Sequence, residues 1–367
     1  MNRKQAFSLN ARILSLSVYP ERADAMPEVL SSFDEEQWKL WVYYSGKHLI
    51  LPGLYYNLHQ HGLIPALPTS LNQYLQQVFS LNTERNEKIR EQSLDLNRML
   101  QQNGIQPVFL KGTGHLCDHL YAHPGMRMMS DIDVVVPPHQ VLSAARLLMD
   151  QGYFSHKPYN PKAFDSTLHY PMLVHEDRVA GIEVHARVLN YLYDGLLPRY
   201  PHGLVSARSH PDVTILSMDD RMVHNFVHTQ LMHSHHYTGI LSLKDMYDYF
   251  LMRHKGGLAP RLRKHQSSFL AYQNIIARYF ECEVVRTQKK ATFTYTMLRA
   301  RHRASLNFPV ILVRFHYFTV MVLQKYFMLP LRSLWNPTAR NFIWSRITHP
   351  GWFQSHIQAW KRLLKRK

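Results

Sequence analysis

The sequence is short of cysteines and of acidic residues for its length. Only Cys117 and Cys282 occur among 367 residues, which argues against a disulfide framework and favours a reducing compartment, so we expect a cytoplasmic protein. Asp and Glu number 26 against 43 Lys and Arg, which leaves a formal net charge of +17. Such an excess favours polyanionic partners such as nucleotides, nucleic acid or anionic membrane surfaces, without choosing among them.

Long uninterrupted apolar runs are absent as well. The segment 6–19 begins like a signal peptide, but Arg12 interrupts it and no small-residue cleavage site follows, so it predicts a helix. The longest apolar region, 308–330, contains Arg314 and Lys325 near its centre. Charges at that depth are costly in hydrocarbon, so we expect no transmembrane segment. A helix that lies on a surface remains open.

The composition fits a folded globular protein with two or three subdomains, because hydrophobic residues make up 46% and charged residues 19%. Neither an internal repeat nor a low-complexity tract is present. Hydrophobic spacing predicts an α+β fold in which a small mixed sheet is flanked by helical regions. The expected boundaries are an N-terminal helical region at 1–80, a core at 81–190 and a C-terminal helical region at 191–367.

Local patterns place the elements. Strands are expected at 107–110 and 129–136, and a hairpin is expected from 170–175 and 179–189. Residues 190–216, rich in Pro, Gly and Ser, predict a linking loop. Helical spacing predicts helices at 36–61, with a break at Pro52-Gly53, and at 69–103, 140–151, 219–236 and 241–253. A short helix is expected at 116–121, opened by Gly112-Thr113-Gly114. Asn103-Gly104 and Gly152 are expected to end the helices that precede them.

The most informative pattern is the paired acid Asp131-Ile132-Asp133 within an apolar strand. Side chains two apart on a strand share a face, so both carboxylates project from one side while Ile132 and Val134 point into a core. Two close carboxylates repel each other unless a positive charge lies between them. For hard oxygen ligands, the usual solution is Mg²⁺ or Mn²⁺.

A third acid belongs to the later strand, where Glu183 and His185 alternate with apolar residues. If the two strands are neighbours, Asp131, Asp133 and Glu183 converge on one patch. That arrangement suits two-metal nucleotidyl transfer, with Glu183 as a metal ligand or general base. A D-x-D pair alone is a weak signal, because many such pairs are surface carboxylates or caps.

Upstream residues supply groups that suit phosphates. Lys111 and the amides of Gly112, Thr113 and Gly114 are expected to face a triphosphate, because free N–H groups at a helix start attract anions. Arg127 would neutralise charge on the transferring phosphate. Lys111 could equally be a solvated strand end. Similarly, His185 either contacts substrate or is a hydrogen-bonded, half-buried histidine.

Two other features carry weaker hypotheses. His224 and His228 have the i, i+4 spacing of zinc ligands, but residue 225 is Asn rather than Glu, so helix packing is favoured. The C-terminal run 360–367 alternates basic and apolar residues. A solvated helix end is the simplest interpretation, and attachment to anionic membranes or to nucleic acid is the alternative.

These residues resemble a family of uncharacterised bacterial nucleotidyltransferases within the DNA polymerase beta-like superfamily. The similarity lies in three segments: Val108-Phe109-Leu110-Lys111-Gly112, Arg127-Met128-Met129-Ser130-Asp131-Ile132-Asp133 and Ile182-Glu183-Val184-His185. It extends more weakly over roughly 30–255, including Trp38, His224, His228 and Leu243-Lys244-Asp245. Thr113 replaces a usual serine, and Ala186 replaces a usual aromatic residue.

The resemblance implies Asp131, Asp133 and Glu183 as metal ligands and catalytic acids, with Mg²⁺ or Mn²⁺ as cofactor. It implies Lys111 and Gly112 in the nucleotide pocket, to which we add the neighbouring Thr113, Gly114, Arg127, Ser130 and His185. The expected activity moves an NMP from an NTP such as ATP to an unidentified hydroxyl on a small molecule, RNA or protein, and releases pyrophosphate. The alternative is a non-catalytic basic accessory protein that binds nucleic acid or anionic membrane on the same scaffold.

Overall fold

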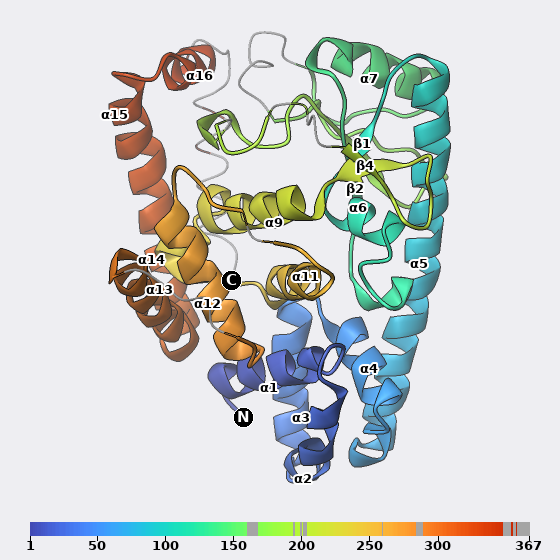
Figure 1. The fold of residues 1–367 in the computed structure, drawn as a ribbon, viewed down its shortest axis with the longest axis vertical. Coiled ribbons are helices and arrows are strands. Elements are labelled where there is room, and N and C mark those ends of the chain that lie inside the picture. The colour runs from blue at the N-terminus through green and yellow to red at the C-terminus, as the bar shows by residue number, and fades with distance from the viewer. Residues whose placement is uncertain are drawn as a thin grey trace.

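The computed structural model describes residues 1–159, 168–193, 195–198, 200, 204–258, 260–283, 289–347, 354 and 357. It confirms an α+β fold, with one five-stranded mixed sheet among helices (Figure 1). The strand order is β3-β2-β1-β5-β4. The strands are β1 (Val108–Phe109), β2 (Asp131–Val135), β3 (Gly181–His185), β4 (Leu204–Ser206) and β5 (Thr214–Leu216).

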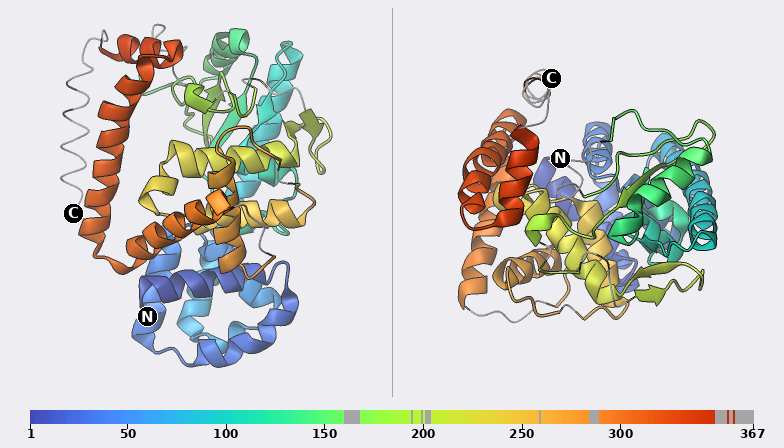
Figure 2. Two further views of the ribbon diagram at one scale, coloured as in Figure 1. Left: turned by 60° about the vertical axis from the view of Figure 1, so that its left-hand side comes forward. Right: turned by 90° about the horizontal axis from the view of Figure 1, so that it is seen from above.

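Helices surround this sheet in three groups (Figures 1 and 2). The N-terminal group is α1 (Arg3–Ser15), α2 (Met26–Ser31), α3 (Glu35–Lys47) and α4 (Leu51–Gln60). The sheet is accompanied by α5 (Thr69–Gln102), α6 (Lys111–Cys117) and α7 (Val141–Asp150). The C-terminal group is α9 (Met218–Phe226), α10 (His235–Thr238), α11 (Leu243–His254), α12 (Gln266–Tyr279), α13 (Lys289–Asn307), α14 (Val310–Val322), α15 (Leu329–Ser333) and α16 (Pro337–Ile347).

Strand β2 has one apolar face and one acidic face, as its alternation predicts. Ile132 and Val134 are fully buried in a core that also contains Ile89 of α5 and Ala144 of α7. The opposite face therefore carries Asp133 away from this core and toward the side of the sheet where α9 and α11 lie (Figure 1).

The long helix α5 fixes the backbone of both acidic strands. Asn86 Nδ2 donates to the carbonyl oxygen of Arg127 over 2.7 Å, just before β2. Gln92 Nε2 donates to the carbonyl oxygen of Ala180 over 2.8 Å, and the Ala180 amide donates back to Gln92 Oε1 over 3.2 Å, just before β3. Both strands thus start from positions that one rigid helix determines.

The predicted hairpin is confirmed, but it is shorter than expected, and β3 is its second strand. Leu173 and Ile182 exchange two backbone hydrogen bonds of 2.9 and 2.7 Å, and His169 bridges to His185 in the antiparallel sense. The loop prediction for 190–216 is wrong at two places, where β4 and β5 complete the sheet. Strand β5 pairs with β1 in parallel, and this tertiary contact stabilises a segment whose own composition is that of a loop.

Three helix boundaries also differ from the prediction. The break in 36–61 falls at 48–50, and Pro52-Gly53 lies in the first turn of α4, where proline needs no amide partner. The short helix starts at Lys111, so the Gly-Thr-Gly segment lies inside its first turn. The predicted helix 219–236 becomes α9, a π-helical turn at Val227–Met232, and α10.

The C-terminal group ends in a continuous helical rod. Helix α14 continues through a π-helical turn at Leu323–Met328 into α15, and α16 follows. The rod lies on the side of the molecule opposite α5 (Figures 1 and 2). Within the described ranges, every helix is too short or too polar to cross a lipid bilayer.

Candidate active site

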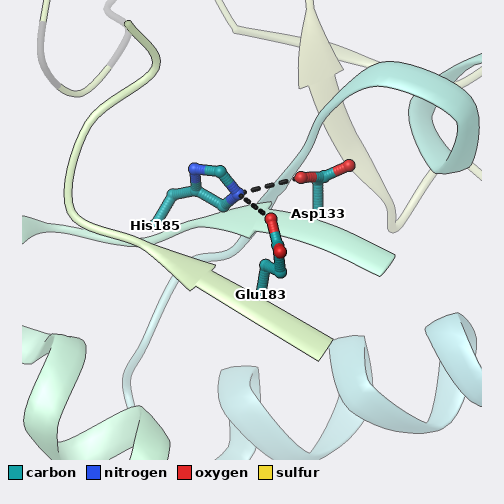
Figure 3. A group of neighbouring side chains, drawn as sticks. All are labelled: Asp133, Glu183 and His185. Carbon is teal, nitrogen blue, oxygen red and sulfur yellow. Dashed lines mark hydrogen bonds and ion pairs between the residues drawn. The ribbon is translucent and has the colours of Figure 1, made fainter. Parts of the chain in front are cut away.

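The register of β2 and β3 brings two acids and a histidine together. The strands are parallel and pair Asp133 with Glu183 and Val135 with His185, so all three polar side chains leave the same face. His185 Nε2 lies 2.9 Å from Asp133 Oδ1 and 3.5 Å from Glu183 Oε2 (Figure 3). The second Asp133 oxygen, Oδ2, is turned away from the histidine (Figure 3).

Lys111 completes this cluster from the first position of α6. Its Nζ donates to Asp133 Oδ1 over 2.7 Å. The residue has a φ of 46°, in the left-handed region that side chains other than glycine seldom adopt, and such backbone strain is concentrated at functional sites. The strained turn therefore holds the ammonium group on the buried carboxylate.

The charges in the cluster shift one another's pKa values. Burial raises the pKa of Asp133, but Lys111 and His185 outweigh it, and the net result is a pKa well below the usual value. Burial also lowers the pKa of Lys111, and the Asp133 carboxylate more than reverses this. The hydrogen bond from His185 lowers the pKa of Glu183. Both carboxylates are therefore ionised at neutral pH.

Asp131 lies at the start of β2, on the same face, but outside the tight cluster. Its partner in the register is Gly181, so no β3 side chain faces it directly. Ser130 Oγ lies 3.5 Å from Asp131 Oδ1. Partial burial and the neighbouring Asp133 charge raise the pKa of Asp131. A cation between the two aspartates would relieve this repulsion.

The glycine turn predicted to meet phosphates is the first turn of α6. No side chain caps this helix start. A β-carbon on Gly112 would collide with Arg127 Nη1, and one on Gly114 would approach the Phe109 carbonyl oxygen to 2.8 Å. Both positions thus require glycine for space. Thr113 Oγ1 lies 3.5 Å from the Asp131 carbonyl oxygen.

Arg127 is bound to an acid that the sequence analysis did not single out. Its Nε and Nη2 donate to both oxygens of Asp248 on α11, over 2.8 to 3.2 Å. Tyr121 donates a further hydrogen bond to Asp248, and His115 Nε2 lies 3.9 Å away. Burial raises the pKa of Asp248, but the Arg127 charge brings it down to about 2. We refer to Arg127, Asp248, Tyr121 and His115 as the closed cluster.

A cleft of about 520 Å³ lies over the acidic face, within the size range of small-molecule sites. Six predicted site residues line one wall: Lys111, Gly112, Arg127, Ser130, Asp131 and Asp133. The facing wall comes from α9, the π-helical turn and α11: Arg221, His224, Asn225, His228, Thr229, Lys244, Asp245 and Asp248. Thr113, Gly114, Glu183 and His185 do not line this cleft.

The histidines of the facing wall are neutral. Burial and the Lys111 charge lower the pKa of His224 to about 3 and that of His228 well below its usual value. The two rings lie 5.8 Å apart and stack. Within the described part of the chain, they belong to no group of three metal-ligating residues.

The side chains that could together hold a cation are instead Asp133, Glu183 and His185. In the part of the chain that the structure describes, this is the one group of three ligand atoms within 4.8 Å of one another. Asp131 adds a carboxylate on the same face. Three acids face one lysine and one histidine here, so the cluster can still accept a divalent cation with oxygen ligands.

Several residues that position the site were missed by the sequence analysis. Asp248 is one, because a single acid between two tyrosines on a helix does not reveal its partner. Asn82, Asn86 and Gln92 are the others, and all three donate to loop backbone from α5. Amide side chains on the buried face of an amphipathic helix were the available signal.

One comparison with known proteins identifies a family for most of the chain. A family model described as uncharacterised nucleotidyltransferase matches residues 34–278, about two thirds of the chain. No curated protein and no solved structure matches the chain.

Proposed function

The chain belongs to the uncharacterised nucleotidyltransferase family, and from that premise we propose that it transfers an NMP from an NTP to a hydroxyl acceptor and releases pyrophosphate. The observation that carries the proposal is the register that sets Asp133 beside Glu183 under a cleft. Asp131, Asp133 and Glu183 would hold Mg²⁺ or Mn²⁺. When bound, the ion would supply positive charge that stabilises the triphosphate and makes the acceptor hydroxyl more acidic.

The chain's own groups fit the donor. In this structure, the Lys111 ammonium group donates to Asp133 Oδ1. When an NTP binds, this group would instead contact the β- and γ-phosphates. The amides of Gly112 and Thr113 belong to a helix start that lacks a side-chain cap and would donate hydrogen bonds to phosphate oxygens. Arg127 Nη1, which lies against Gly112, would add a positive charge there.

The transfer balances in one step. The acceptor oxygen forms a bond to the α-phosphorus, and the bond from that phosphorus to the β-phosphate oxygen breaks. The acceptor proton passes to solvent in the cleft, because Glu183 does not line it and its lowered pKa makes it a weak base. His185 orients Glu183 and Asp133 because its Nε2 lies between their oxygens. The facing wall of α9 and α11 is where the acceptor would bind.

Labelled nucleotides test this function. We expect label from α-labelled NTP, but not from γ-labelled NTP, to enter a component of cell extract when purified protein and Mg²⁺ are added. Asp131→Ala/Asp133→Ala should abolish this transfer, and Asp150→Asn, a change of one exposed acid on α7, should not. Equal transfer by the wild type and the double variant would refute the proposal. The mass increment on the product identifies both donor and acceptor.

A further inference from the structure

The charge of the chain is concentrated in its last part. Glu283 is the last acidic residue, so all 26 acids lie in 1–283, with 27 Lys and Arg. The remaining 84 residues contain 16 Lys and Arg and no acid, and they supply +16 of the net +17. The part of the chain that holds the cleft is therefore nearly neutral, and the basic excess belongs to another surface.

The same region exposes an apolar helix. Helix α14 has no buried residue, although ten of its thirteen residues are apolar. Ile311, Phe315 and Trp335 have 74, 67 and 69% of their surfaces exposed. A helix this apolar is normally covered by protein or lipid, and exposed apolar patches of this kind mark interaction sites.

Tryptophan follows the same distribution. Four of the six tryptophans, Trp335, Trp344, Trp352 and Trp360, lie in the last 33 residues. Trp335 and Trp344 are both exposed. Tryptophan, apolar side chains and Lys or Arg without acids form the composition that prefers the headgroup layer of a membrane.

We propose that residues 308–367 bind the surface of an anionic lipid membrane, with the exposed side chains of α14 and α15 in the headgroup layer and the basic residues on lipid phosphates. A second copy of this chain is a poor occupant, because two regions of +16 would repel each other. Nucleic acid would neutralise the charge but leave Ile311 and Phe315 in water. The proposed contact is peripheral, with the helices lying along the membrane surface.

Flotation of the full-length protein with vesicles tests the proposal, without NTP or Mg²⁺, so the result is independent of the proposed activity. We expect binding to vesicles of phosphatidylcholine with phosphatidylglycerol, and none to phosphatidylcholine alone. Ile311→Ser/Phe315→Ser should lower the partition coefficient by about tenfold or more. Replacing the five basic residues of 361–367 by Gln should lower it by at least about a hundredfold.

Leu81→Ser is the matched control, because Leu81 is 59% exposed and belongs to α5, a helix on the opposite side of the molecule from α14. It should bind like the wild type, and far-UV circular dichroism should show all variants folded. Failure of the wild type to float with anionic vesicles, or equal binding to neutral ones, overturns the proposal. So does a wild-type dimer that Ile311→Ser/Phe315→Ser converts to a monomer, because a second copy would then cover the apolar face.

Discussion

Two clusters of charge line the same cleft, and they differ in how completely their acids are satisfied. In the closed cluster, Asp248 receives hydrogen bonds on both oxygens from Arg127 and a further one from Tyr121. In the open cluster of Asp131, Asp133, Glu183, Lys111 and His185, the two bonds to Asp133 both fall on Oδ1. The closed cluster thus has one acid for one arginine, whereas the open cluster has three acids for one lysine and one histidine.

This difference separates structural from chemical roles. A buried carboxylate with hydrogen bonds on both oxygens offers none of them to a cation, and breaking its ion pair leaves an uncompensated charge. An acidic cluster with too few donors is itself destabilising until a cation binds. We therefore expect substitutions in the closed cluster to act on stability and those in the open cluster to act on activity.

The largest expected effect is on catalysis. Asp133→Asn should reduce NMP transfer by about a thousandfold or more, because a metal-binding carboxylate is lost. Its free energy of unfolding should fall by about 1–3 kcal/mol, because Lys111 and His185 stabilise the Asp133 charge, while Asp131 and Glu183 remain to compensate Lys111. Transfer assays and urea unfolding measure the two quantities. A large loss of stability with unchanged transfer would reverse the assignment of the clusters.

The next effect breaks the closed cluster. Asp248→Asn keeps an acceptor for Arg127 but removes the charge, so the guanidinium is left buried and unpaired. We expect the free energy of unfolding to fall by about 3–5 kcal/mol, as measured by urea unfolding. Tyr121→Phe is the milder control, with an expected loss of about 1 kcal/mol, because it removes one hydrogen bond and no charge. If Asp248→Asn unfolds like the wild type, the cluster is not structural.

The two clusters also show what the sequence could predict. The acids of the open cluster could be predicted, because period-two alternation alone assigns Asp131, Asp133 and Glu183 to strand faces. The closed cluster was not, because Arg127 and Asp248 are 121 residues apart and nothing local in either segment reveals the pairing. Arg127 was therefore predicted to bind phosphate, and its contact with Asp248, which occupies Nε and Nη2, was not predicted.

The sheet repeats this lesson. Strands β1 to β3 lie in apolar, β-branched runs, whereas β4 and β5 have three residues each and lie in a stretch rich in Pro, Gly and Ser. Strand β5 pairs with β1, a non-local contact that composition does not encode, and β4 in turn pairs with β5. The short helix was predicted to start at 116 but starts at Lys111. The first turn of a helix tolerates glycines that its interior would not, so Gly112 and Gly114 did not mark the boundary.

A cation should stabilise the open cluster and leave the closed one unaffected. At a Mg²⁺ concentration 100 times its Kd, the free energy of unfolding should rise by about 2.7 kcal/mol, because the ion binds only the folded state. Asp131→Asn/Asp133→Asn should lose this increment, and Asp150→Asn should keep it. Urea unfolding with Mg²⁺ or EDTA measures the difference. An equal increment in the double variant would place the binding site elsewhere.

The smallest expected effect is on the pH dependence of the free energy of unfolding, through a histidine of the closed cluster. Burial lowers the pKa of His115, in the closed cluster, to about 3, so the unfolded chain binds a proton below pH 6.5 that the folded chain does not. The neutral histidine costs nothing above that pH, and stability is lost as the pH falls from 6.5 toward 3. Between pH 6.5 and 5.5 the loss is about 1 kcal/mol for this one residue. The variant His115→Gln should therefore show a pH dependence of unfolding that is shallower by that amount, and an unchanged dependence would mean that His115 is protonated in the folded protein.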